Sequence, residues 1–560
     1  MIQDTQGRRS MKNVLPKYTC FIILLLLATI FLFAALEVLL ALTPPIARDV
    51  LIHHLAIPKL WLMHGGFYET PWAVYSYYPM NLDLLYLAPL YFGNDIVPNF
   101  IHLSFSLGTA VLIYLYLKSK VGLLAALLGA AAFISLPIVV RMSTTAYVDF
   151  GLVFFSTASV LALICWRDSE YQKNGWLMIS AVALGLALGT KYNALLAWFF
   201  LTLAVVFIYA KDTGKQWPAL KWGLVFFAVS LLVFSPWLIK NAVLTGNPFY
   251  PLFRGLFGHS GASAGGVYSA VAGGSGLSLF KAREMIYGES IWESLLIPIR
   301  FFFQGQDHSP RYFDGVLNPV LILIAPLAFI QGKLKADKLL FVSFAGFFIL
   351  TAFFLDQHRI RYILPAIPFV IILMAMGFVH LFEWFDGRSA PYRMIYRGVL
   401  AIVMVCMIAI NVVYMGRYWQ TIGPVHYLLK KESRDQFIAR HDLSYPAVRY
   451  INDHTPENSK IRLILLAGRG YYLNRPYEDN ALFGVDIIKN LVSLSSDPAA
   501  FQKYLKSLNS THFLIRYDLL GEHLARMFSR EEIEQFSAVL ARKAKIIFRD
   551  DHYAVCKLDI

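Results

Sequence analysis

The chain has 560 residues, of which 57% are hydrophobic and 15% are charged, whereas soluble domains carry roughly 25% charged residues. Its mean hydropathy is +0.54, and 50 Lys and Arg against 36 Asp and Glu give a net charge of +14. These values exclude a single soluble domain and a disordered or fibrous chain, and the recurring apolar runs indicate a polytopic membrane protein.

The first predicted span, residues 18–42, follows the basic residues Arg8, Arg9, Lys12 and Lys17. Its length of about 25 residues exceeds the apolar region of a signal peptide, and no small-residue cleavage site follows it. We therefore predict a retained helix preceded by a cytoplasmic N-terminus, residues 1–17. Ten further segments approach the ~20 residues that a bilayer requires: residues 99–117, 121–139, 148–165, 175–190, 193–210, 220–239, 316–331, 338–355, 362–382 and 397–415.

Residues 82–93 are apolar as well, but a helix of that length extends only about 18 Å, less than the ~30 Å hydrocarbon core. When this segment is not counted as a span, the loops rich in Lys and Arg all fall on the side of the N-terminus, as cytoplasmic loops do. We therefore predict an interfacial helix here, on the outer face. The positive excess points to cytoplasmic loops and anionic phosphates, so we expect membrane lipids as partners and no nucleic acid.

The outer face then holds a first loop at 43–98, a long loop at 240–315 that is rich in Gly and Ser near 259–276, and the segment 416–560. This last segment lacks transmembrane character and has the pattern of a small α/β domain. Short apolar runs at 462–467, 512–517, 546–548 and 553–558 alternate with helix-like stretches at 500–508 and 530–544. The predicted fold is a polytopic α-helical membrane domain, residues 18–415, followed by a soluble extracytoplasmic α/β domain, residues 416–560.

Ionisable groups at a membrane boundary are costly, so each one requires an explanation. Asp49 lies just outside the first span, and His53 and His54 follow one helical turn later. Asp49 and His53 share a helix face at positions i and i+4, where a carboxylate and an imidazole could act on one substrate hydroxyl or bind one metal ion. The alternative is that Asp49 caps an interfacial helix and that the histidines lie among lipid headgroups.

Asp149 opens a predicted span on the same face, where it is either a second functional carboxylate or a partner of the helix dipole. Lys191, Arg359 and Arg361 lie on that face too, against the positive-inside bias. These cations either extend to lipid headgroups or bind the phosphate group of a substrate. Their gathering with two acids on one face favours phosphate binding.

Other polar residues are less informative. Glu37, inside the first span, is expected to be paired within the bundle, and Asp83 alone is expected to be solvated in an outer loop. Tyr78 belongs to an interfacial aromatic belt or stacks on a sugar. The cysteines, Cys20, Cys165, Cys406 and Cys556, are widely spaced and indicate isolated thiols.

The sequence resembles the GT-C membrane glycosyltransferases, which use sugars carried on polyprenyl phosphate, and is most similar in layout to protein O-mannosyltransferases and bacterial lipid A aminoarabinose transferases. The resembling stretches span roughly residues 18–370 and keep one order and sidedness. They are Asp49-Val50-Leu51-Ile52-His53-His54-Leu55, Ala146-Tyr147-Val148-Asp149, Gly189-Thr190-Lys191-Tyr192-Asn193, Lys240-Asn241 with Thr245-Gly246-Asn247-Pro248, and Arg361-Tyr362-Ile363-Leu364-Pro365-Ala366-Ile367-Pro368.

The resemblance implies a GT-C fold, here with about eleven spans, and transfer of a sugar from a polyprenyl-phosphate donor to a lipid, glycan or protein acceptor, with inversion. The reaction would take place at the outer face of the bacterial cytoplasmic membrane. Asp49, Asp149, His53 and His54 would be catalytic, with Asp49 accepting the hydroxyl proton. Substrate-binding residues would be Lys191, Arg359, Arg361, Tyr78, Asn81, Asp83, Tyr192 and Asn247. The resemblance fixes no cofactor and leaves a divalent metal as an open alternative.

The chain departs from both relatives. Protein O-mannosyltransferases typically show Asp-Glu where this chain has Asp49-Val50, and aminoarabinose transferases show Glu-Lys before a proline where it has Tyr77-Tyr78 before Pro79. Metal use and substrate therefore do not carry over. Two other functions stay open, a transporter or flippase of a lipid-linked or anionic substrate and a membrane-anchored binding module. A transporter favours charges at mid-membrane and an internal repeat, neither of which is visible in the sequence.

Overall fold

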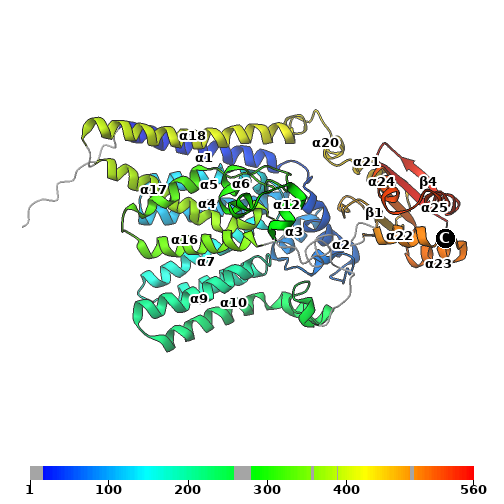
Figure 1. Cartoon of the computed structure of the whole chain (residues 1–560), viewed down its shortest axis with the longest axis horizontal. Helices are drawn as coiled ribbons and strands as arrows, with labels where there is room; N and C mark the ends of the chain where they lie inside the picture. Colours follow the sequence, from blue (N-terminus) through cyan, green and yellow to red (C-terminus); the bar gives the residue numbers. More distant parts are fainter. Residues whose placement is uncertain (1–16, 258–278, 355–357, 387–388, 480–484, 560) are drawn as a thin grey trace, which may run out of the picture.

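The computed structural model describes residues 17–257, 279–354, 358–386, 389–479 and 485–559. Apart from Lys17, the N-terminus expected to be cytoplasmic lies outside the described residues, as does the Gly- and Ser-rich segment at 259–276. The described chain is a bundle of long helices with a small sheet domain beyond one end of the bundle (Figure 1).

Eight helices of the described chain are long and apolar enough to cross a bilayer. In chain order they are α1 (Lys17–Ala41), α4 (Val97–Lys120), α7 (Asp149–Asp168), α9 (Ala194–Thr213), α10 (Gln216–Thr245), α16 (Lys335–Phe353), α17 (Ile367–Asp386) with the preceding η6 (Ile360–Ala366), and α18 (Ala390–Ile422). Each corresponds to one of the spans expected from the sequence, so the polytopic helical fold is confirmed.

The three other expected spans are bent or short. Residues 121–139 form α5 (Leu123–Ile134) and α6 (Pro137–Ser143), which meet at an angle of 60°. The helix breaks here because Pro137 has no N–H with which to continue the hydrogen bonding of α5. The remaining two segments form α8 (Gly175–Leu188), α15 (Val320–Ile324) and η5 (Ala325–Ile330).

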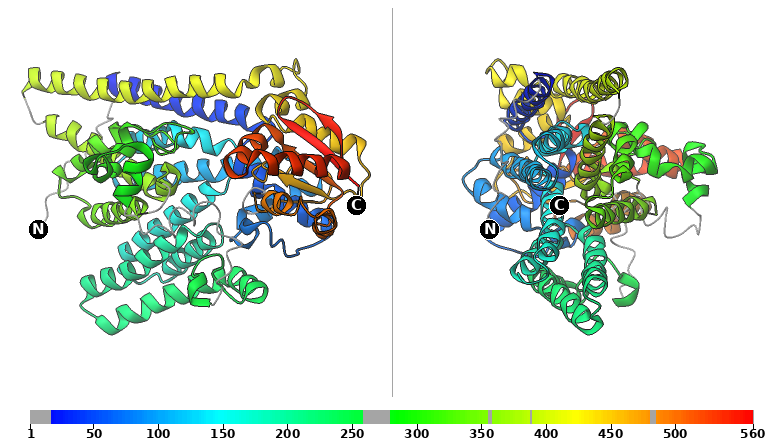
Figure 2. Two further views of the ribbon diagram at one scale, coloured as in Figure 1. Left: turned by 45° about the vertical axis from the view of Figure 1, so that its right-hand side comes forward. Right: turned by 90° about the vertical axis from the view of Figure 1, so that its left-hand side faces the viewer.

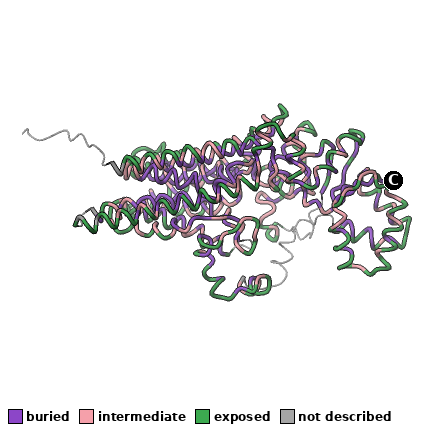
Figure 3. The backbone as a smooth tube through the Cα atoms, turned by 90° about the horizontal axis from the view of Figure 1, so that it is seen from above, coloured by how far each residue is buried: buried purple, intermediate pink, exposed green. Residues whose placement is uncertain are grey.

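Burial separates central from peripheral helices. In η6 with α17, 89% of the most apolar stretch is buried, and in α7 78%, against 22% in α1 and in α9. Exposed residues of the outer helices are themselves apolar, such as Phe31 and Phe207, as expected where the surrounding solvent is lipid. The end-on view shows the helices packed side by side (Figure 2), and the view from above shows exposed residues along the outside (Figure 3).

The two ends of the bundle differ. At one end, Lys120 of α4 pairs with Asp168 of α7 across 2.5 Å, and Arg167 pairs with both Asp168 and Asp337. Three of the segments expected on the cytoplasmic side therefore meet there. The other end carries the short helices of residues 43–98, the loop expected on the outer face. They are η1 (Val50–His54), α2 (Ala56–His64), η2 (Val74–Tyr77) and α3 (Asn81–Tyr91), and α3 corresponds to the helix expected at 82–93.

The described parts of the long loop are also short helices. They are η3 (Arg254–Phe257), α12 (Leu279–Tyr287), α13 (Ile291–Leu295) and α14 (Ile297–Phe303). Glu289 is buried and accepts hydrogen bonds from Arg283 at 2.6 Å and from Arg300 at 3.1 Å. A buried carboxylate requires such cationic partners, and this one holds α12 against α14.

The soluble domain follows α18 through α19 (Pro424–Leu428), α20 (Arg434–His441) and α21 (Tyr445–His454). Its sheet has the strand order β2 (Tyr477–Glu478), β1 (Ile461–Ile464), β3 (His512–Arg516), β5 (Tyr553–Leu558) and β4 (Ala544–Arg549). β1 is parallel to β2 and β3, and β5 is antiparallel to β3 and β4.

Helices cover both faces of this sheet. Phe513 and Ile515 of β3 pack in one apolar cluster, and the alternate residue Leu514 packs in another, with α21. The first cluster includes residues of α22 (Val485–Ser493), α23 (Pro498–Ser507), α24 (Tyr517–Met527) and α25 (Arg530–Lys543). The expected α/β domain is confirmed, while the two-residue β2 is too short for a periodic pattern to predict.

Residues 468–474 of the soluble domain attach it to the first outer loop. The Tyr471 N–H donates to the Leu51 carbonyl of η1 at 3.2 Å. The Lys59 ammonium donates to the carbonyls of Tyr471 and Leu473 at 2.8 and 2.9 Å. Gly468 has a φ of +77°, and a Cβ there would lie 3.2 Å from Ile52, so this close approach favours glycine. The soluble domain thereby contacts η1 from outside the bundle.

We expect Lys59→Met to loosen this attachment. The variant keeps an apolar stem but removes the donor to two carbonyls, and an unpaired buried acceptor costs about 1–3 kcal/mol. Hydrogen exchange of the full chain should become faster in residues 468–474 and in η1, but not in β3. Unchanged exchange in 468–474 would contradict the attachment, and Lys460→Met at an exposed lysine is the control.

Candidate active site

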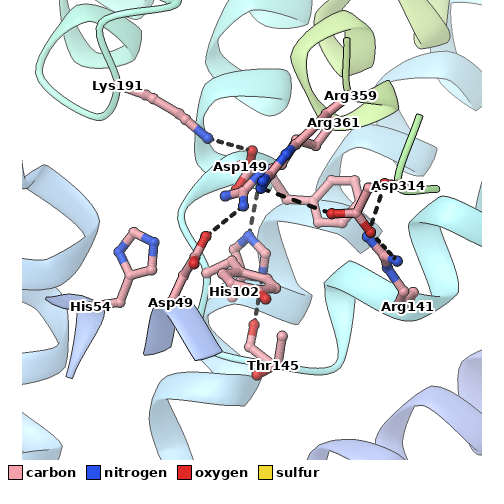
Figure 4. Close-up of polar contacts among 12 residues, drawn as sticks. Asp49, His54, His102, Arg141, Thr145, Asp149, Lys191, Asp314, Arg359 and Arg361 are labelled. Carbon is pink, nitrogen blue, oxygen red and sulfur yellow. Dashed lines mark hydrogen bonds and ion pairs between the residues drawn. The ribbon is translucent and has the colours of Figure 1, made fainter. Parts of the chain in front are cut away.

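Asp149, the first residue of α7, lies at the centre of a group of charged side chains (Figure 4). Its side chain is 1% exposed, and it accepts a hydrogen bond on Oδ1 from Lys191 at 2.6 Å and on Oδ2 from Arg361 at 3.0 Å. α7 has no side-chain cap, so helix capping does not account for Asp149. Its carboxylate holds two cations together.

Arg361 joins the two acidic residues. Its NH1 group donates to Asp49 Oδ2 at 2.5 Å, its NH2 group donates to Asp149, and the guanidinium lies 5.1 Å from the Tyr147 ring centre. Arg361 Nε is buried and has no hydrogen-bond partner among the described residues. Asp49 stands at the N-cap position of η1 without making a capping hydrogen bond. Two carboxylates and two cations thus form one network, which we call the charged network (Asp49, Asp149, Lys191, Arg361).

Each member of the charged network lies where a helix begins or departs from α geometry. Asp49 precedes η1, which is a π-helix, and Arg361 lies in η6, a 3-10 helix that contains Pro365. Asp149 begins α7, and Lys191 lies in the turn between α8 and α9. Because π turns are rare and often occur at functional sites, the position of Asp49 directly before one supports a functional site.

The charge of Arg361 determines the state of Asp49. Partial burial alone would raise the pKa of Asp49, but the neighbouring guanidinium outweighs burial and holds this pKa well below its ordinary value. Burial and the charge of Arg361 lower the pKa of Lys191, against the opposing effect of Asp149. Asp49 is therefore ionised and a weak proton acceptor.

A row of aromatic rings lies beside η1. His53 stacks on Tyr75 with ring centres 4.4 Å apart, Tyr75 contacts Tyr78 at 5.5 Å, and Tyr78 contacts Tyr192 at 5.5 Å. Burial lowers the pKa of His53 to about 3, so its ring is neutral at neutral pH. Tyr75 is 42% exposed, so this aromatic row (His53, Tyr75, Tyr78, Tyr192) reaches the surface and offers ring faces for packing.

Two expectations about acidic residues are wrong. Asp83, expected to be solvated, is 1% exposed and lies 2.8 Å from His54 Nδ1, because α3 packs against η1 and α2. Glu37, expected to be paired within the bundle, has both carboxyl oxygens buried without a hydrogen-bond partner among the described residues. Spacing in the sequence does not reveal either environment, since both depend on neighbouring helices.

Besides Tyr78, Asp83 and Tyr192, three more candidate substrate-binding residues lie outside the charged network. The Asn81 side chain accepts from Trp237 at 2.8 Å and donates to the Leu186 carbonyl at 3.3 Å. Asn247 is fully buried and bonds to the backbone of its own turn. Arg359 is 25% exposed and lies 3.9 Å from Asp314. Asn81 therefore joins α3 to α8 and α10, Asn247 stabilises its own turn, and Arg359 has a solvent-accessible charge.

His102 of α4 is a residue of this site that was not predicted from the sequence. One ring nitrogen of His102 lies 2.8 Å from the Thr145 carbonyl, and the other accepts the Phe150 N–H at 2.9 Å. His102 thus fixes the turn that leads into Asp149 (Figure 4). The available signal was a polar stripe at helical spacing on an otherwise apolar span, formed by Asn99, His102, Ser106 and Thr109.

The residues present do not fit a divalent metal. Within the described residues, no group of three or more His, Cys, Asp and Glu is arranged to hold one. The carboxylates of Asp49 and Asp149 are instead engaged with cationic side chains. We therefore derive no chemical step through a metal ion.

Comparison with known proteins identifies related sequences and structures. A protein-family model described as dolichyl-phosphate-mannose-protein mannosyltransferase matches residues 67–253, whereas a search of curated proteins found no match. The crystal structure of ArnT from Cupriavidus metallidurans bound to undecaprenyl phosphate has a TM-score of 0.55 at 14% identity, covering 96% of this chain and 98% of that chain.

A second similar structure is the archaeal oligosaccharyltransferase AglB from Archaeoglobus fulgidus in complex with an inhibitory peptide and a dolichol-phosphate. It has a TM-score of 0.54 at 12% identity, covering 93% of this chain and 72% of that chain. At such identities the likeness shows the fold. The fold expected from the resemblance is thus confirmed, and the family model matches one part of the chain, residues 67–253.

We expect Asp149→Asn to destabilise the full chain by about 3–5 kcal/mol, because the largely buried Lys191 then loses its carboxylate partner and Arg361 keeps Asp49 alone. Asp49→Asn should cost less, since its side chain is 27% exposed. Thermal unfolding of the purified variants in detergent measures both effects. Equal melting temperatures for the two variants would contradict the central position of Asp149.

Proposed function

We propose that this chain is an integral-membrane glycosyltransferase that transfers a sugar from a polyprenyl phosphate, such as undecaprenyl phosphate, to a lipid, glycan or protein acceptor. The observation that carries the proposal is the charged network at the end of the bundle with the first outer loop. The fold shared with ArnT and the family match over residues 67–253 support the same class of chemistry.

The donor phosphate would bind to Lys191 and Arg361. An ammonium has three protons, and Lys191 donates to Asp149 alone among the described residues, so two protons are left for phosphate oxygens. The buried Nε of Arg361 supplies a further donor. The pair of cations is already neutralised by Asp49 and Asp149, so an incoming phosphate needs additional positive charge, which the partly exposed Arg359 can provide.

Transfer would be a single displacement with inversion through an oxocarbenium-like state. The acceptor oxygen bonds to the anomeric carbon while the bond from that carbon to the phosphate oxygen breaks. The polyprenyl phosphate leaves with added negative charge, which Lys191 and Arg361 stabilise. Asp49, whose pKa is lowered by Arg361, would orient the acceptor hydroxyl and stabilise positive charge on the sugar.

The aromatic row would hold the sugar. Tyr75 and Tyr78 lie next to η1, which carries His53 and follows Asp49. Ring faces pack on the apolar faces of sugars, and the exposed position of Tyr75 gives an acceptor access from outside. We place this end of the bundle at the outer face of the bacterial cytoplasmic membrane, with the N-terminus cytoplasmic and the soluble domain extracytoplasmic, in keeping with the distribution of Lys and Arg.

Removal of the protein from its cells should cause one polyprenyl-linked sugar to accumulate, because its consumption stops. Mass spectrometry of the lipid extract identifies that sugar. Wild-type protein supplied in trans should reverse the accumulation, whereas Asp149→Asn should not. A lipid profile that is the same with and without the protein would contradict the proposed function.

Lys191→Ala should weaken binding of undecaprenyl phosphate to the full chain by about 10- to 100-fold, because a charge-assisted hydrogen bond contributes about 1.5–3 kcal/mol and about 1.4 kcal/mol corresponds to tenfold. Titration with the lipid, followed by native mass spectrometry, measures the affinity. Lys173→Ala, at an exposed lysine between α7 and α8, is the control. Full affinity in a folded Lys191→Ala protein would favour simple extension of Lys191 to lipid headgroups.

A further inference from the structure

His54 and Asp83 form a buried pair next to the charged network. His54 Nδ1 lies 2.8 Å from Asp83 Oδ1, and the two side chains are 6% and 2% exposed. His54 ends η1, which follows Asp49, and Asp83 lies in the first turn of α3. The pair thus links η1, the helix that follows Asp49, to α3.

The second ring nitrogen of His54 is unused. His54 Nε2 is buried and has no hydrogen-bond partner in the part of the chain that the structure describes. His102, by contrast, has both ring nitrogens bonded to backbone groups. A buried polar atom without a partner is costly, so its retention calls for an explanation. Figure 4 shows His54 beside Asp49, and the charges of Asp49, Asp149 and Lys191 all act on its ring.

We propose that His54 and Asp83 together accept the proton of the acceptor hydroxyl, a role that rests on the proposed transferase function. As the acceptor oxygen bonds to the anomeric carbon, its proton passes to His54 Nε2. The Nδ1 proton of His54 passes to Asp83 Oδ1, and the electron pair of the broken bond leaves on the polyprenyl phosphate. His54 is a catalytic residue in this scheme, and Asp83, which cannot reach the substrate, is a positioning residue and the final proton acceptor.

The environments of Asp83 and Asp49, the two carboxylates that could serve as the final base, also favour Asp83. Burial raises the pKa of Asp83 to about 7, although His53 and Lys191 act in the opposite direction. The pKa of Asp49 lies far below this value because of Arg361. When neighbouring carboxyl groups are shifted apart in this way, the one with the higher pKa is the better base near neutral pH. Burial also lowers the pKa of His54 to about 3, so its ring is neutral and keeps a lone pair.

The alternative is a purely structural role, in which the hydrogen bond between His54 and Asp83 only holds α3 against η1. Both functions need the hydrogen bond, but only proton transfer needs the lone pair on Nε2. Asp83→Asn separates them, because an amide of the same shape donates to Nδ1 and forces the proton onto Nε2. The variant therefore keeps the contact and its packing while removing the base.

The test adds purified full-length variants to membranes from cells that lack the protein, which hold both the accumulated donor and the unmodified acceptor. The maximal rate of donor loss is measured by mass spectrometry, and affinity is measured with undecaprenyl phosphate. We expect Asp83→Asn and His54→Gln each to lower the maximal rate about 10²- to 10⁴-fold with unchanged affinity. The double variant should be no slower than the slower single variant, because the two residues act as one unit.

The pH dependence of the maximal rate distinguishes proton transfer from a purely structural role, because a structural hydrogen bond alone would not change it. Asp83 must be ionised to accept the proton, so the wild-type maximal rate should fall as the pH falls below about 7, and Asp83→Asn should lose this dependence. The ionisable groups facing the pair, which all stay in place in the variant, are Asp49, His53, Tyr86, His102, Tyr147, Asp149, Lys191 and Arg361.

His64→Gln, at an exposed histidine one helix away, is the matched control and should leave rate and pH profile unchanged. Wild-type rate and pH dependence in folded Asp83→Asn and His54→Gln would overturn the pair as proton acceptor while leaving the transferase intact. If the affinity for undecaprenyl phosphate fell in parallel with the rate, this role as proton acceptor would also be overturned, because a parallel loss indicates a structural role for the pair. Failure of the wild-type protein to consume the donor would instead overturn the proposed function.

Discussion

The candidate active site of this protein depends on one contact, the Asp149 carboxylate held between Lys191 and Arg361. Any one of these charges, placed alone in the apolar end of the bundle, would be strongly unfavourable. Together with Asp49 they sum to zero net charge, and this allows η1, α7, the turn before α9 and η6 to meet at one point. The interaction thus fixes the arrangement of segments that lie as far apart in the chain as residues 49 and 361.

Irregular helices and the soluble domain are arranged around this contact. A π turn follows Asp49 and a 3-10 turn carries Arg361, and His102 fixes the turn before Asp149. The soluble domain contacts η1 through the Tyr471 backbone. A site assembled from loops becomes well ordered only when its neighbours restrict it, and here the bundle restricts it from one side and the soluble domain from the other.

Much of this architecture could be predicted from the sequence, because the length of apolar runs and the position of Lys and Arg are direct consequences of the bilayer. The same reasoning singled out Lys191 and Arg361, since cations on the outer face run against the positive-inside bias, and Asp149, since an ionisable group at a membrane boundary is costly. It could not predict the bend at Pro137, which divides one apolar run into two helices. Nor could it pair His54 with Asp83, because that contact depends on how α3 packs, which apolar periodicity does not specify.

We propose that Lys191 and Arg361 bind the phosphate of a polyprenyl donor while Asp149 holds them in place. An experimental structure of the full chain with undecaprenyl phosphate tests this most directly. We expect phosphate oxygens within hydrogen-bond distance of Lys191 Nζ and of the Arg361 guanidinium, with both contacts to Asp149 retained. A phosphate bound elsewhere on the protein, with the charged network unchanged, would contradict it.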